Sequence, residues 1–333
     1  MLFPIFEDGK IGYINKNGNE VIAPQFEWYS VPGIPNSVDM SPGNLFREGV
    51  AAAMKDGKWG FIDEMGNWVI KPTFDFADSF SEGLAGVTVG KKCGFIDHSG
   101  KIVIAARYDD VHDFSEGLAA VNEVAGDDKT DHWHYIDKSG NTIFPQKFRD
   151  PSQFTDGVAA VQVFSEEAQT LSYGYIDHTG AFAISPQFDS AYDFLEGMAC
   201  VCWEGDGCGY INKKGETIIK PTSSLPSNFS EGLAIFSGKP DGEFSEGYIN
   251  PKGEIVIPSQ FQEAHYFTEG LAPAQAKDKW RYKWGYIDKK GAFIVDPIFD
   301  RANHFHNGLA RVEINAKDAY INKSGHVIWR ATN

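Results

Sequence analysis

The chain has 333 residues, of which 42% are hydrophobic and 14% aromatic, so it is too apolar to be an intrinsically disordered protein. Its 30 basic and 46 acidic residues give a net charge of −16, which argues against general binding to nucleic acid or to anionic membranes. No apolar run is long enough to cross a membrane, and residues 1–10 lack the basic start and cleavage site of a secretory signal. We therefore expect a folded cytoplasmic protein.

One pattern recurs along the chain: glycine, an aromatic residue, isoleucine, and then Asp or Asn. His134 and Ala319 take the glycine place in two further copies. The glycines are Gly12, Gly60, Gly94, Gly174, Gly209, Gly247 and Gly285. Copies are 34 to 48 residues apart, which indicates a single array of about nine repeats. The repeats are expected near residues 2–45, 46–79, 80–113, 114–153, 154–193, 194–228, 229–266, 267–304 and 305–333.

Three strand-like segments can be recognised in each repeat. The clearest are Trp59–Asp63 as a second strand, Trp68–Ile70 as a third strand and Leu84–Val89 as the next first strand. These runs are rich in Val, Ile and aromatic residues and end at Gly, Asp, Asn or Pro, which favours strands over helices. Because both faces of the strands carry apolar residues, we expect neighbouring repeats to cover each small sheet on two sides.

The second and third strands are joined by Asp or Asn followed three residues later by Gly. In Asp63–Gly66 the Asp side chain is expected to cap a type I turn while the Gly takes a positive φ, which makes a bulged hairpin. We therefore interpret these side chains as turn builders and not as catalytic groups. The equivalent residues are Asn15, Asp97, Asp137, Asp177, Asn212, Asn250, Asp288 and Asn322.

A connector follows the third strand and leads into the next repeat. Phe74, Ala77 and Phe80 are three residues apart, so a short helical or 3₁₀ turn would place all three in the core. Gly83 would then release the chain into the next strand.

The run Lys58-Trp59-Gly60-Phe61-Ile62-Asp63, the later Gly66, and Phe80-Ser-Glu-Gly-Leu-Ala85 resemble the WG (KWG) repeat family of bacterial proteins. The resemblance covers nearly the whole chain. It implies a β-rich repeat scaffold and supplies no common set of catalytic residues. Glu246 and Asp318 stand where the pattern requires an apolar residue, so we expect those repeats to pack differently.

The repeats predict an all-β fold of tandem three-stranded meanders, arranged either as an open β superhelix or as a closed β-propeller. Nine repeats exceed the usual four to eight propeller blades. The chain also begins with a first strand, Leu2–Phe6, and ends with a third strand, Val327–Trp329, so no displaced strand is left to close a ring. We therefore expect an open superhelix, or solenoid, with a closed propeller as the alternative.

The cysteines and histidines do not form a convincing metal site. Cys93 and Cys208 precede a Gly-aromatic-Ile step and are expected to be buried apolar substitutes. Cys208 could also join Cys200 and Cys202 in a thiolate cluster, but the paired CxxC spacing of zinc sites is absent. The pairs His132/His134 and His304/His306 each place two imidazoles on one strand face without a third ligand nearby, so we expect neutral histidines.

No catalytic motif is recognisable. Gly86–Lys92 is one residue too short for a phosphate-binding loop and lacks the Ser or Thr that should follow the Lys. We expect no cofactor, no metal and no enzymatic activity. An active site assembled between repeats, for which the four histidines above would be candidates, is the alternative.

Segments that interrupt the repeat are the candidate contact sites. The insertion from Trp28 to Leu45 begins with Trp28 and Tyr29, and four further excursions fall between first and second strands. Three of them would form an acidic rim suited to a basic partner, and the fourth carries residue types that are frequent in binding hot spots. The candidate residues in these excursions are Asp127, Asp128, Glu166, Glu167, Trp280, Arg281 and Tyr282.

These features favour a non-enzymatic scaffold that binds another protein, either to neutralise a basic toxin or to organise a complex. A glycan- or peptide-binding module is the second hypothesis, because exposed Trp and Tyr side chains stack on sugars. An enzyme is the third.

Overall fold

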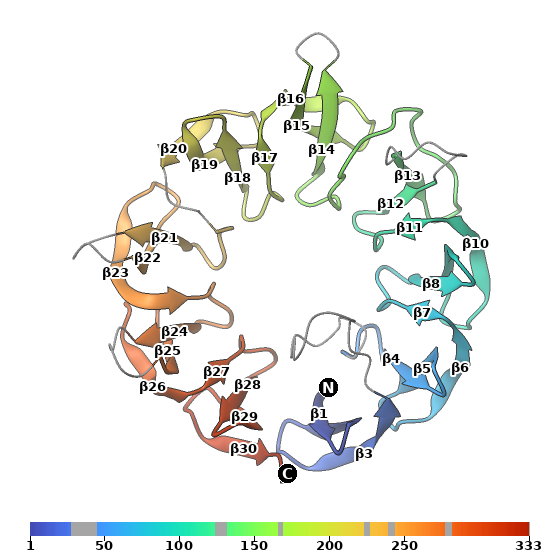
Figure 1. Cartoon of the computed structure of the whole chain (residues 1–333), viewed down its shortest axis with the longest axis vertical. Helices are drawn as coiled ribbons and strands as arrows, with labels where there is room; N and C mark the ends of the chain where they lie inside the picture. The colour runs from blue at the N-terminus through green and yellow to red at the C-terminus, as the bar shows by residue number, and fades with distance from the viewer. Residues whose placement is uncertain are drawn as a thin grey trace. The chain divides into compact units, whose positions relative to one another are not determined.

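The computed structural model describes residues 1–27, 45–123, 132–165, 169–222, 227–238, 244–276 and 282–332. These residues form strands joined by turns, and no helix occurs among them (Figure 1). The predicted all-β class is therefore confirmed. Within the same ranges, no helical segment has the length and apolarity needed to cross a bilayer.

The chain divides into two compact units, and the N-terminal unit is Met1–Phe154. Its described residues form three antiparallel sheets, each made of consecutive strands. The first sheet holds β1 (Leu2–Glu7), β2 (Lys10–Asn15), β3 (Glu20–Glu27), β4 (Val50–Lys55), β5 (Lys58–Asp63) and β6 (Trp68–Phe74). The second holds β7 (Phe76–Ala77), β8 (Ala85–Val89), β9 (Lys92–Ile96) and β10 (Ile102–Tyr108). The third holds β11 (Asp110–Val111), β12 (Leu118–Asn122) and β13 (Trp133–Asp137).

The C-terminal unit is Thr155–Thr332, and the part of it that the structure describes forms four antiparallel sheets. The first holds β14 (Val158–Ser165), β15 (Thr170–Asp177) and β16 (Phe182–Phe188). The second holds β17 (Ser190–Ala191), β18 (Met198–Trp203), β19 (Gly207–Asn212) and β20 (Thr217–Thr222). The third holds β21 (Ala234–Gly238), β22 (Ser245–Ile249), β23 (Ile255–Ala264), β24 (Ala272–Ala276), β25 (Trp284–Ile287) and β26 (Phe293–Phe299). The fourth holds β27 (Arg301–Ala302), β28 (Leu309–Ile314), β29 (Lys317–Asn322) and β30 (Val327–Arg330).

The glycine of the recurring step is required by a close backbone approach. A Cβ on Gly60 would lie 2.4 Å from the carbonyl oxygen of Ile70 and 2.7 Å from the nitrogen of Pro72. Strand β6 therefore crosses directly over this glycine, and its register on β5 shifts there. Any side chain at position 60 would push β6 away from β5.

The fourth repeat shows what happens when this glycine is replaced. His134 stands at the glycine place in β13 and is only 7% exposed. The segment after its turn forms no regular third strand and meets β13 only at the isolated bridges Ile136↔Thr142 and Trp133↔Phe148. The repeat that carries His134 at the glycine place thus has no regular third strand.

The connector after the third strand differs from the expected helical or 3₁₀ turn. Phe74, Ala77 and Phe80 are all buried, as expected, but Phe76 and Ala77 form the short strand β7. Ala77 pairs with Val87 of the next repeat. The segment is extended because its hydrogen bonds go to the neighbouring first strand and not to a local turn.

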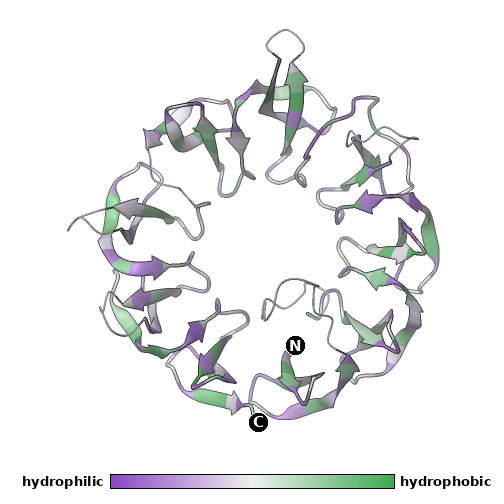
Figure 2. Ribbon diagram, viewed as in Figure 1, coloured by the Kyte–Doolittle hydropathy of each residue, from purple (hydrophilic) through white to green (hydrophobic). Residues whose placement is uncertain are grey.

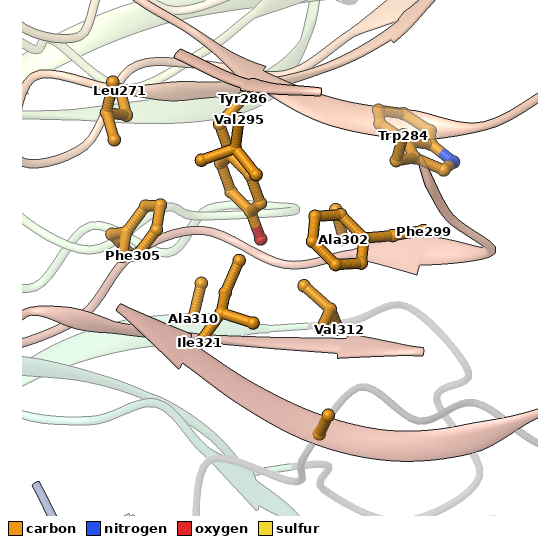
Figure 3. Close-up of a cluster of buried hydrophobic side chains, with 11 residues drawn as sticks. Leu271, Trp284, Tyr286, Val295, Phe299, Ala302, Phe305, Ala310, Val312 and Ile321 are labelled. Atoms are coloured by element: carbon orange, nitrogen blue, oxygen red, sulfur yellow. The ribbon is translucent and has the colours of Figure 1, made fainter. Parts of the chain in front are cut away.

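Each core lies between the sheets of successive repeats. In the C-terminal unit, Tyr286 of β25 and Val295 of β26 point toward Phe305 and Ile321 of the following sheet (Figure 3). All four side chains are buried, and burying a side chain of this size contributes about 1.5–3 kcal/mol. Hydrophobic residues recur along the strands of both units (Figure 2). The expectation that neighbouring repeats cover each other's sheets is confirmed within this core.

Candidate functional site

Most of the contact residues proposed from the sequence lie outside the described residues. Tyr282 is described and is 62% exposed, just before β25. The assignment of a contact site to the loops therefore stays a prediction. The candidates outside the described ranges are Trp28, Tyr29, Asp127, Asp128, Glu166, Glu167, Trp280 and Arg281.

The recurring Asp and Asn side chains build turns, as predicted. Oδ1 of Asp137 accepts the N–H groups of Ser139 at 2.9 Å and Asn141 at 2.8 Å. The hydrogen bond from the Asn141 side chain, followed by that from its backbone, lowers the pKa of Asp137. Gly140 has a φ of +80°, as the bulged hairpin requires. These Asp and Asn side chains are therefore engaged in the hydrogen bonds of their own turns.

A second carboxylate, which was not singled out from the sequence, joins one repeat to the next in six places among the described residues. Glu269 has a positive φ, and its Oε2 accepts the N–H of Gly308 at 3.0 Å. Nζ of Lys323 lies 3.0 Å from the same oxygen. The Ser/Thr-Glu-Gly pattern can be seen in the sequence. The sequence does not show that the Glu carboxylate accepts a hydrogen bond from the next repeat, because this contact depends on the positive φ of the Glu and on how the two repeats pack.

Tyrosines of the second strands fix the connectors in the same way. The hydroxyl of Tyr286 donates to the carbonyl oxygen of Asn303, 17 residues later, at 2.8 Å. Burial raises the pKa of this phenol, so it stays protonated as a donor. The same contact is made by Tyr135, Tyr175, Tyr210 and Tyr248.

The two acidic departures from the repeat pattern pack differently, as predicted. Glu246 accepts the backbone N–H of Ala264 at 2.6 Å, and burial raises its pKa. Asp318 accepts two hydrogen bonds from the guanidinium of Arg311, at 3.1 and 2.5 Å. Both carboxylates therefore have structural partners.

The cysteines depart from expectation. Cys202 of β18 and Cys208 of β19 face each other across the hairpin and form a disulfide. Cys208 is therefore neither a free apolar substitute nor a thiolate ligand. Cys200 is buried and free, and burial raises its thiol pKa to about 12. Cys93 is only half-buried.

The His304/His306 pair does not lie on a strand face as expected, whereas His134 lies in β13 and His132 directly precedes it. His304 and His306 lie in the turn after β27, not in a strand. Burial lowers the pKa of His134, and burial together with His265 lowers that of His304 to about 4, so both imidazoles are neutral at pH 7. In the ranges that the structure covers, no three His, Cys, Asp or Glu side chains gather in a metal-binding arrangement.

Against this repeated frame, the two residues before each buried connector Phe change from repeat to repeat. In five repeats the first residue of the pair donates its backbone N–H to the next first strand. These bonds are Asp78 to Gly86, His112 to Ala120, Tyr192 to Cys200, His265 to Pro273 and Asn303 to Arg311, all at 2.9 or 3.0 Å. We call these positions the variable pairs: Asp78/Ser79, His112/Asp113, Ser152/Gln153, Tyr192/Asp193, Ser227/Asn228, His265/Tyr266 and Asn303/His304.

Two variable pairs of the N-terminal unit contain a carboxylate, Asp78 in one and Asp113 in the other. Burial raises the pKa of Asp78 to about 7, and the negative charges of Asp113 and Asp110 add to the effect. Burial also raises the pKa of Asp113, although Arg47 and His112 oppose the shift. Among the described residues no ion pair neutralises Asp78. The carboxyl group of Asp78 therefore keeps its proton to higher pH than an exposed carboxyl group does.

In the C-terminal unit, rings from two neighbouring variable pairs, His265/Tyr266 and Asn303/His304, stack on one another. The His304 ring lies 3.7 Å from that of Tyr266 and 5.3 Å from that of His265, centre to centre. His265 in turn lies 4.6 Å from Trp284 of β25. Tyr266 remains 47% exposed at the end of this stack. An exposed ring held by others offers a rigid aromatic contact surface.

A model of the WG containing repeat matches the chain in nine stretches. They are residues 11–31, 44–59, 59–93, 94–123, 133–163, 173–205, 209–237, 247–280 and 284–317. The resemblance recognised in the sequence is thereby confirmed. No curated protein matches the chain.

Several solved structures are similar in fold. The crystal structure of the eukaryotic initiation factor matches 99% of this chain and 95% of that chain, at 12% identity and a TM-score of 0.65. The β-propeller domain of the Trilobed protease from Pyrococcus furiosus, which has an open velcro topology, matches over 86% of this chain and 100% of that chain, at 8% identity and a TM-score of 0.40. Prolyl oligopeptidase B from Galerina marginata matches over 78% of this chain and 51% of that chain, at 9% identity and a TM-score of 0.47.

The likeness to the initiation factor structure, which extends over 99% of this chain, shows a β-propeller fold, so the open superhelix, or solenoid, expected from the sequence is wrong. That expectation assumed that a propeller needs a strand displaced from one chain end to the other. In the described residues, every sheet is made of strands that follow one another in sequence, from β1 at the start to β30 at the end. The terminal strands complete their own sheets and therefore do not distinguish an open array from a propeller.

Proposed function

The chain belongs to the WG containing repeat family, and we propose that it is a protein-interaction module that binds its partner through the variable pairs. A propeller of repeats is commonly such a module. The proposal assigns the chain no reaction of its own. The observation that carries it is one repeated backbone hydrogen bond at five equivalent positions, which carry four different residue types: Asp78, His112, Tyr192, His265 and Asn303.

The fixed frame supports this function because it leaves recognition to the residues that vary. The turn carboxylates, the Glu of the Glu-Gly turns and the second-strand tyrosines are all engaged in internal hydrogen bonds. The variable pairs combine carboxylates in one unit with imidazole and phenol rings in the other. Residues placed on a rigid scaffold in this way lose little conformational entropy on binding.

The chemistry favours a partner with a basic surface. The net charge of −16 raises the encounter rate with a cationic protein. A lysine or arginine of the partner would stabilise the ionised forms of Asp78 and Asp113, while Tyr266 would provide an aromatic contact. A basic toxin and a basic member of a larger complex both fit this description. We propose that the chain meets this partner in the cytoplasm.

The test is affinity capture from a bacterial lysate at low and moderate salt, followed by quantitative mass spectrometry. Asp113→Asn and Tyr266→Ala should each reduce the capture of the same basic proteins at least tenfold. Ile298→Ala, at an exposed apolar residue outside the variable pairs, should leave capture unchanged. The proposal fails if no captured protein depends on the variable pairs, and glycan-array binding that requires Tyr266 would favour the glycan hypothesis instead.

A further inference from the structure

Strand β10 is an exposed edge of the sheet that runs in the order β10-β9-β8-β7 (Figure 1). An edge strand presents backbone N–H and C=O groups that another extended chain can pair with. Proteins commonly prevent this with proline, which removes an N–H, or with charged residues along the strand.

Most third strands of this chain carry proline six residues after the glycine of the hairpin turn. These prolines are Pro24 in β3, Pro72 in β6, Pro186 in β16, Pro221 in β20 and Pro297 in β26. Strand β10 carries Ala106 at this place. It therefore keeps a backbone donor that five other third strands lack.

The backbone of β10 follows the same path as the strands with proline. A Cβ on Gly94 would lie 2.7 Å from the nitrogen of Ala106, and a Cβ on Gly60 would lie 2.7 Å from the nitrogen of Pro72. In the proline strands a ring carbon occupies the place of the amide hydrogen, so there is open space in that direction. The pairing of β10 with β9 joins Ile104 to Phe95 and Tyr108 to Cys93 and passes over Ala106. The N–H of Ala106 is thus not needed by the sheet.

The side chains of β10 indicate what would pair with it. Ile102 is 46% exposed and Val103 is 38% exposed, and the ribbon of β10 is largely in the hydrophobic colour in Figure 2. Lys101 and Arg107 are exposed at the two ends. Asp109, which follows, is paired with Lys92 at 2.7 Å. The Arg107 guanidinium donates to the Tyr108 hydroxyl at 2.8 Å, and this neutral partner leaves its charge in place. Lys101 is close enough to Asp97 for an attraction between the two charges, so its charge is partly compensated.

We propose that β10 accepts one additional antiparallel strand, supplied by an extended segment of a partner that has an apolar middle and carboxylates at both ends. Backbone hydrogen bonds would hold this segment, and Lys101 and Arg107 would select its acidic ends. A second copy of the chain fits less well. Antiparallel pairing of two β10 strands about Ile104 would place Lys101 opposite Arg107, which brings like charges together.

The experiment uses the full chain and a fluorescein-labelled peptide, Glu-Val-Thr-Val-Thr-Val-Glu, followed by fluorescence anisotropy at low salt. The peptide should bind the unmodified chain, and hydrogen exchange should slow at residues 102–107. Ala106→Pro should weaken binding at least tenfold without unfolding the chain, because five repeats already accept proline there. The double variant Lys101→Glu, Arg107→Glu should lose this peptide and bind its lysine-ended counterpart.

Three results would overturn the proposal: no binding by the unmodified chain, equal binding by Ala106→Pro, or protection outside β10. Self-association that rises with concentration and disappears in Ala106→Pro would also overturn it, because a second copy would then be the occupant. The partner capture described above depends on other residues, so either proposal can fail without the other.

Discussion

Oε2 of Glu82 accepts the backbone N–H of Gly117, one repeat further along the chain, at 3.0 Å. The same carboxylate lies 3.1 Å from Nζ of Lys138, two hairpins further on. Glu82 itself has a φ of +53°, which glycine adopts more readily than any other residue. An unfavourable backbone conformation is therefore retained at a place where the side chain connects successive repeats.

Removing this carboxylate should destabilise the N-terminal unit. Glu82→Ala loses both contacts and keeps the positive φ, so the free energy of unfolding should fall by about 1–2 kcal/mol in urea titrations. Glu82→Gly loses the same contacts but removes the strain of a positive φ at a non-glycine residue. Its free energy of unfolding should therefore fall by roughly 1 kcal/mol less than that of Glu82→Ala. Equal losses in the two variants would show that the backbone strain does not contribute.

Gly60 should tolerate no side chain. Gly60→Ala places a Cβ 2.4 Å from the carbonyl oxygen of Ile70, and the free energy of unfolding should fall by at least about 3 kcal/mol. Gly57→Ala is the matched control, because Gly57 has a positive φ but no atom within 4 Å of the added Cβ. Its cost should be about 1 kcal/mol. A reversed order in thermal melts would contradict the role given to the close approach of β6.

The stability of the N-terminal unit should fall as the pH rises. Burial, with help from Asp113 and Asp110, raises the pKa of Asp78 to about 7 in the folded chain, above the ordinary value of 3.8. The folded state therefore binds the proton more tightly, and this contribution is lost as the pH rises from about 4 to about 7. Asp78→Asn should remove it, so the variant should gain stability over the parent at pH 8, by at most about 4 kcal/mol. Urea titrations at pH 5 and pH 8 would contradict this if the gain were the same at both.

The disulfide should be detectable and should stabilise its own hairpin. Reduction of the disulfide should add two mass units to the chain and speed hydrogen exchange in β18 and β19. The free energy of unfolding should fall by roughly 2 kcal/mol, because the disulfide closes only a short loop. In the native oxidised chain Cys200 should resist alkylation, because burial raises its pKa to about 12, while half-buried Cys93 should react first. Alkylation of Cys202 or Cys208 without reductant would contradict the disulfide.

The sequence predicted the all-β class and the turn chemistry because these depend on short-range patterns. The positive φ of Gly66 and the cap made by Asp63 need only four neighbouring residues. The effect of His134 on the third strand was not predicted, because it depends on how closely that strand passes over the glycine of the second. The disulfide between Cys202 and Cys208 depends on cross-strand register and was missed for the same reason.

The variable pairs were not found from the sequence, and the reason is also structural. Asp78 and His265 are ordinary polar residues until the repeated bonds to Gly86 and Pro273 show that they occupy equivalent places. The sequence analysis looked for function in the interruptions of the repeat. The structure directs attention to positions inside it, where an unchanged backbone carries changing side chains.

The most direct measurement is hydrogen exchange of the chain alone and in complex with the basic protein that it captures. Slower exchange should appear at residues 78–80 and 112–114 in the N-terminal unit and at residues 265–267 and 303–305 in the C-terminal unit, and Tyr266→Ala should reduce it. Protection confined to the segments between first and second strands, with the variable pairs unchanged, would contradict the account.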